Sequence, residues 1–68
     1  MTPDQFAALA ELLRLRGGPA TEGARLVLVE GIGVVRAAEQ VGCSRQSVGN
    51  TVKRCRAGLE LARRAARV

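Results

Sequence analysis

Two stretches with apolar residues at helical spacing are separated by only three residues, Gly42-Cys43-Ser44. Before this break, the predicted inner face of a helix consists of Val34, Ala37, Ala38 and Val41. After it, the predicted buried stripe consists of Val48, Thr51, Val52, Cys55, Leu59 and Ala62. Gly42 can adopt a positive φ without steric cost, and Ser44 is a favoured helix N-cap residue. So short a turn forces the helices to cross steeply, as in a helix-turn-helix, here expected over about residues 34–56.

This crossing depends on the size of a few residues at fixed positions. Ala38 lies one turn before Gly42 and is expected to face the second helix, where a larger side chain would push the two helices apart. Val48 is expected to hold the second helix on the first, and Val52 continues its buried face. We therefore assign these four residues to the architecture of the helix-turn-helix.

The first part of the chain also predicts helices. Thr2-Pro3-Asp4-Gln5 combines a capping residue, a proline suited to the first turn and a glutamine that completes a capping box. A helix is therefore expected from about Pro3 to Leu15, ended by Arg16-Gly17-Gly18-Pro19.

The next segment, from Pro19 to Gly31, contains Leu26-Val27-Leu28-Val29, which fits either a strand or a buried helix. A lone strand would have no partner to pair with, so a helix of about ten residues is favoured. We therefore predict an all-α fold, a small helical bundle of four to five helices in a single domain over residues 1–68. A helical tail over residues 57–68 follows the helix-turn-helix.

Charge is divided unevenly along the chain. Residues 1–43 carry four arginines against five carboxylates, whereas residues 44–68, Arg67 included, carry seven cations against Glu60 alone. The net charge of +5 therefore resides entirely in the last part of the chain. Segregation of this kind indicates a polyanionic partner, although a basic helix face exposed to solvent would give the same pattern.

The outward face of the second helix has the side chains that read base edges in DNA. One stripe opposite the buried face is predicted to contain Arg45, Gln46, Gly49, Asn50 and Lys53. Arginine pairs with guanine, and glutamine or asparagine pairs with adenine, through two hydrogen bonds. Glycine inside a helix costs stability, so Gly49 suggests either a close approach of the backbone to the groove floor or a neighbouring group in the fold that needs the space.

Phosphate contacts are expected from residues that flank this stripe. The candidates are Ser44, Arg36, Arg54 and Arg56. For Arg63, Arg64 and Arg67, an exposed surface without a partner is an equally good interpretation.

Two segments, Ala24–Gly31 and Ala38–Val52, resemble the TrfB/KorA family of plasmid transcriptional repressors. The resemblance implies an all-helical domain that binds a palindromic operator as a homodimer and silences promoters of a plasmid or other mobile element. Arg45 and the two architectural valines match the family pattern, whereas Asn50 stands where the family has a base-reading glutamine. The family has a C-terminal dimerisation module beyond its helix-turn-helix. The residues that carry the resemblance do not include that module, so the resemblance assigns no dimer interface here.

A homodimer is also expected on physical grounds, because one recognition helix covers only a few base pairs and two-fold symmetry doubles the site. The apolar residues available in the tail are Leu59, Leu61, Ala62, Ala65, Ala66 and Val68. This surface would contact a second copy of the chain, or would pack on Phe6 and Leu9 of the same chain.

Other classes of function have less support in the sequence. The absence of histidine and the spacing of Cys43 and Cys55 argue against a metal site and against a catalytic thiol, so we expect no cofactor, no small-molecule ligand and no enzyme activity. No apolar stretch is typical of a signal peptide or a membrane span, which favours the bacterial cytoplasm and association with the nucleoid.

The sequence therefore predicts a sequence-specific regulator that binds double-stranded DNA, most simply a repressor. Two alternatives remain, a protein-binding adaptor or antitoxin-type module and a non-specific architectural DNA binder.

Overall fold

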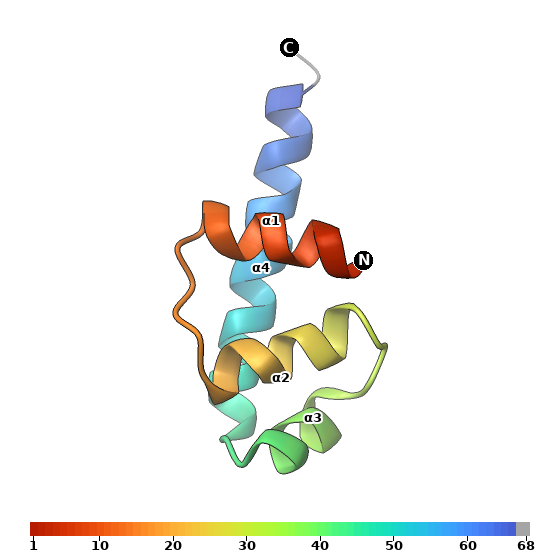
Figure 1. The fold of residues 1–68 in the computed structure, drawn as a ribbon, viewed down its shortest axis with the longest axis vertical. Helices are drawn as coiled ribbons and strands as arrows, with labels where there is room; N and C mark the ends of the chain where they lie inside the picture. Colours follow the sequence, from red (N-terminus) through yellow and green to blue (C-terminus); the bar gives the residue numbers. More distant parts are fainter. Residues whose placement is uncertain (67–68) are drawn as a thin grey trace.

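The computed structural model describes residues 1–66, which form four α-helices and no strand (Figure 1). The helices are α1 (Pro3–Leu12), α2 (Pro19–Leu28), α3 (Val34–Val41) and α4 (Arg45–Ala66). The predicted all-α fold is thereby confirmed, and the ambiguous segment belongs to the helix α2 and its C-cap Val29. Arg67 and Val68, which were counted in the basic segment and in the apolar tail, lie outside the described residues.

Helix α1 begins as predicted but ends earlier than predicted. The amide of Gln5 donates to Thr2 Oγ1 over 3.1 Å, and the amide of Thr2 donates to Gln5 Oε1 over 3.0 Å, which completes the capping box. The expected end at Leu15 is wrong, because Arg14 adopts a left-handed conformation with φ 54°. The amide of Leu15 then donates to the carbonyl of Ala10 over 2.9 Å, which closes the helix in the manner of a Schellman motif.

The connection between α3 and α4 has the geometry that the sequence predicts. Gly42 lies in the left-handed region, with φ 69° and ψ 35°, and the amide of Cys43 donates to the carbonyl of Ala38 over 3.0 Å. Ser44 Oγ accepts a hydrogen bond of 3.1 Å from the amide of Ser47, so Ser44 caps α4. Only three residues, 42–44, therefore lie between the end of α3 and the start of α4.

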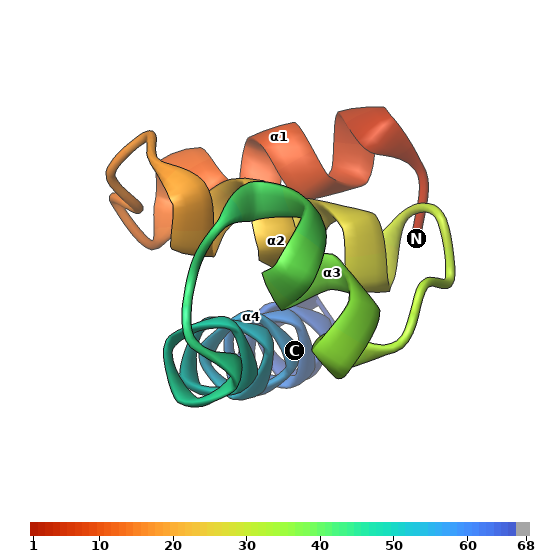
Figure 2. The same cartoon turned by 90° about the horizontal axis from the view of Figure 1, so that it is seen from below.

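The core lies where α2 crosses both α3 and α4, and Figure 2 shows α1 and α2 stacked on one side of α4. The buried apolar residues are Phe6, Leu9, Ala24, Leu26, Ala37, Ala38, Val48, Val52 and Cys55. This set includes Ala38, Val48 and Val52, which the sequence assigned to the architecture.

Gly23 of α2 permits the closest approach in this core. A Cβ atom at Gly23 would lie 2.7 Å from Val48 Cγ2 and 3.4 Å from Val41 Cγ2. Val48 was expected to hold α4 on α3, and its fully buried side chain also lies directly against α2. This contact is made by the backbone of α2, which lies outside the helix-turn-helix. The sequence pattern of α3 and α4 therefore does not indicate it.

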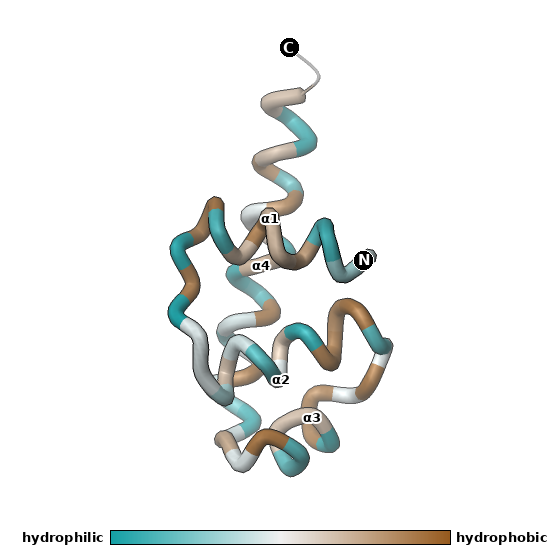
Figure 3. The backbone as a smooth tube through the Cα atoms, in the orientation of Figure 1, coloured by the Kyte–Doolittle hydropathy of each residue, from teal (hydrophilic) through white to brown (hydrophobic). Residues whose placement is uncertain are grey.

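Helix α4 is continuous over 22 residues, so residues 57–66 are part of the second helix and not a separate tail. Gly58 is buried within it, where a Cβ atom would lie 2.9 Å from Leu13 Cδ2. Beyond this contact the helix projects past α1 (Figure 1), and Figure 3 shows hydrophilic and hydrophobic residues alternating there. Ala62, predicted to be buried, is exposed, because it lines an open hollow between α1 and α4 and is not packed against α1.

Substitution of Gly23 by alanine tests the contact between α2 and α4. The overpacking cost of about 1–3 kcal/mol is offset by about 1 kcal/mol of helix propensity, so Gly23→Ala should lower the free energy of unfolding by up to about 2 kcal/mol. Urea denaturation followed by circular dichroism measures this change. Gly17→Ala is the matched control, because a Cβ atom there meets nothing within 4 Å. Equal loss of stability in the two variants would contradict the proposed packing.

Candidate nucleic-acid interface

The first half of α4 presents its polar side chains to solvent. Arg45, Gln46, Asn50 and Lys53 are exposed, and Gly49 is half-buried among them. The opposite side of the same helix is buried, with exposed fractions of 0% for Val48, 4% for Val52 and 0% for Cys55. The structure therefore brings the five predicted base-reading residues together on the accessible side of one helix.

Gly49 differs in its packing from Gly23 and Gly58, the other two glycines that lie inside helices. Gly23 and Gly58 lie against Val48 and Leu13, where a Cβ atom would come closer than 3.0 Å. A Cβ atom at Gly49 would meet no atom within 4 Å. Packing within the chain therefore does not require glycine at this position, although glycine weakens the helix.

The predicted phosphate-contacting residues do not form one cluster. Arg36 is exposed on α3, and Ser44 is exposed in the turn, where its hydroxyl donates to Ser47 Oγ over 2.9 Å. Arg56 is exposed near Leu28 and Leu59. Arg54, one turn after Asn50, is directed toward the end of α1, where its Nη2 donates to the carbonyl of Leu13 over 3.0 Å. Arg36, Arg54 and Arg56 therefore lie in different places around the base-reading face.

Two basic residues beside α4 were missed by the sequence analysis. Arg14 and Arg16 were counted only in the charge of the first 43 residues, and they line a hollow that also includes Arg54. The left-handed conformation at Arg14 shapes this loop, and a single arginine in a helical pattern carries no signal for that conformation. Only the fold brings these three side chains together.

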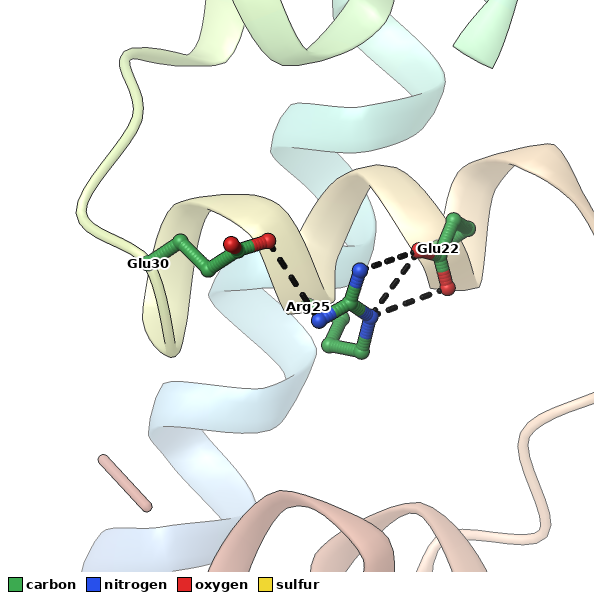
Figure 4. Close-up of polar contacts among 3 residues, drawn as sticks. All are labelled: Glu22, Arg25 and Glu30. Atoms are coloured by element: carbon green, nitrogen blue, oxygen red, sulfur yellow. Dashed lines mark hydrogen bonds and ion pairs between the residues drawn. The ribbon is translucent and has the colours of Figure 1, made fainter. Parts of the chain in front are cut away.

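Arg25 of α2, which is half-buried, is compensated by carboxylates. Its Nε donates to Glu22 Oε1 over 2.9 Å, and its Nη1 lies 3.4 Å from Glu30 Oε2 (Figure 4). The hydrogen bond from Arg25 lowers the pKa of Glu22, and the same bond raises the pKa of Arg25. The local charge on α2 is thereby balanced, and the excess positive charge remains on α4 and the loop before α2.

The two cysteines are free thiols at the edge and in the centre of the fold. Burial raises the pKa of the Cys55 thiol, so the group stays neutral in the core and is a poor nucleophile. Cys43 is half-buried in the turn between α3 and α4. Within residues 1–66, no three His, Cys, Asp or Glu side chains are placed to share a metal ion.

The proposed dimer surface is partly used within the chain and partly exposed. Leu59 packs against the core, whereas Leu61 is 63% exposed, and Ala65 and Ala66 are exposed with it. Next to them lies a shallow, almost wholly apolar hollow between α1 and α4. It is lined by Gln5, Ala8, Leu9, Leu12, Leu59 and Ala62. Packing on α1 therefore covers the start of this surface and leaves its end uncovered.

No protein-family model, curated protein or solved structure matches this chain significantly. None of the helices described here is both long and apolar enough to cross a membrane.

Substitution of Gly49 by alanine separates a folding role from a binding role. Because a methyl group meets open space there, Gly49→Ala should raise the free energy of unfolding by up to about 1 kcal/mol through helix propensity. Thermal and urea denaturation of the variant and the wild type measure this change. A loss of stability instead would mean that the fold itself requires glycine at this position.

Proposed function

We propose that this chain is a transcriptional regulator that binds double-stranded DNA in a sequence-specific manner, with α3 and α4 as its helix-turn-helix. The observation that carries the proposal is the open space over Gly49, surrounded by the exposed side chains of Arg45, Gln46 and Asn50. Glycine at this position lowers the stability of the helix, and no contact within the chain requires it. We infer that contact with a molecule outside the chain compensates for this loss.

In this proposal the first half of α4 enters the major groove, which is about 12 Å wide and admits one helix. Arg45 donates two hydrogen bonds to O6 and N7 of a guanine, and Gln46 and Asn50 each pair with an adenine edge. Each such pair contributes about 1–3 kcal/mol of discrimination against the wrong base. Gly49 lets the backbone approach the groove floor, and Lys53 extends the contact along the groove.

The remaining helices hold α4 in the orientation that this contact needs. Gly42 and Ser44 set where α4 begins, and Val48 holds its inner face on α2. Arg36 on α3 and Arg56 on α4 contact phosphates on either side, which positions the helix without selecting a sequence.

We further propose that two copies bind a palindromic operator and repress transcription, as the resemblance to the TrfB/KorA family implies. The apolar hollow between α1 and α4 and the exposed side chains of Leu12 and Leu61 form the contact between the copies, since Leu12 and Leu61 are large apolar residues that the chain itself leaves exposed. Such a protein acts at the bacterial nucleoid, in the cytoplasm.

Replacing Asn50 by alanine tests direct base reading. Asn50→Ala should lose about 1–3 kcal/mol of preference for a selected duplex over a scrambled duplex, because one paired adenine edge is lost. Affinity for the scrambled duplex should change little. Titration of both duplexes, followed by fluorescence anisotropy, gives the ratio of the two affinities.

Two further variants serve as controls for this test. Arg56→Ala should weaken binding to both duplexes alike, because it removes a phosphate contact. Gly49→Ala should bind the selected duplex more weakly although it folds more stably. An Asn50→Ala protein with unchanged preference would argue for an adaptor or a non-specific architectural binder instead.

A further inference from the structure

The loop between α1 and α2 forms a second basic surface beside α4. Together with Thr51 and Arg54 of α4, the segment 14–21 lines an open hollow of about 380 Å³. Three arginines, Arg14, Arg16 and Arg54, contribute to its walls. Figure 1 shows this loop leading from the end of α1 to the start of α2, to the left of α4.

Contacts within the chain fix the backbone that carries Arg14 and Arg16, and they fix the side chain of Arg54 beside it. Arg14 lies in the left-handed conformation that ends α1, and the hydroxyl of Thr21 donates to the carbonyl of Arg16. Arg54 reaches the same loop through its hydrogen bond of 3.0 Å to the carbonyl of Leu13. That bond uses only one of the five N–H groups of Arg54, so the others remain available.

Within the described residues, no carboxylate compensates this charge. The residues that line the hollow include no aspartate or glutamate. Glu22, which directly follows the segment that lines the hollow, is bonded to Arg25 on α2. Every ion pair recorded for residues 1–66 involves Arg25 or Arg64, so the three arginines of the hollow take part in none. Like charges held close together without a counter-charge repel each other, and an anion between them relieves this repulsion.

We propose that this hollow binds phosphates of the DNA strand that borders the groove occupied by α4, an inference that rests on the function proposed above. Arg54 lies one helical turn after Asn50 and reaches the loop between α1 and α2, so the hollow adjoins the edge of the base-reading face. A helix inserted in the major groove has a phosphate backbone on each side, and guanidinium groups bind phosphate oxygens through paired hydrogen bonds. Arg14 and Arg16 thereby add affinity that is independent of sequence.

The experiment compares the double variant Arg14→Gln/Arg16→Gln with the wild type and with Arg63→Gln/Arg64→Gln. The second double variant removes the same charge from the projecting end of α4 and serves as the matched control. Arg54 is left intact because it also holds the loop. Binding of a selected duplex and of a scrambled duplex is measured over a series of salt concentrations, and denaturation curves verify that each variant folds.

The salt dependence of binding should distinguish the two variants. Loss of two phosphate contacts should reduce the slope of log K against log salt by about 1.8, whereas the control should retain the wild-type slope. The affinity of the Arg14→Gln/Arg16→Gln protein should fall by the same factor for both duplexes. A slope equal to that of the control would overturn the phosphate assignment while leaving the base-reading face intact.

The same data separate this inference from the proposed function. A wild-type protein that binds both duplexes equally, but loses slope in Arg14→Gln/Arg16→Gln, would retain the phosphate site and refute sequence-specific reading. A wild-type protein that binds neither duplex would refute both.

Discussion

The contact between Val48 and Gly23 determines which side of α4 is buried and which side faces solvent. Val48 is fully buried, and the missing side chain at Gly23 lets the backbone of α2 lie directly against it. Because α4 is thereby held on α2 by one side, its opposite side must face solvent over the same turns. The exposed position of Arg45, Gln46 and Asn50 is therefore a consequence of packing on the inner side of the helix.

The parts of the fold that sequence predicts well are those determined by neighbouring residues. The capping box at Thr2, the left-handed turn at Gly42 and the cap at Ser44 all involve hydrogen bonds across at most five residues, and each was expected. The same holds for the face of α4, because a period of 3.6 residues separates its buried and exposed sides. Local chemistry was sufficient for these elements.

Features that depend on distant parts of the chain were missed or misplaced. Arginine is uncommon in the left-handed conformation, so the residues around Arg14 do not indicate that α1 ends three residues before the expected position. The role of Gly23 follows only from its contact with a residue 25 positions later. Ala62 matched the buried stripe by spacing, but the space between it and α1 is an open hollow, so Ala62 is exposed. In each case the outcome depends on contacts between distant parts of the chain, which the periodicity of the sequence does not predict.

The central claim is that α4 reads DNA sequence as part of a two-fold symmetric dimer, and selection of bound duplexes from random DNA tests it most directly. The mass of the protein in the selected complex is measured alongside. The account predicts a palindrome whose half-sites lie about one helical turn apart, bound by two chains. A single motif bound by one chain would contradict the dimer, and the absence of any enriched sequence would contradict base reading by α4.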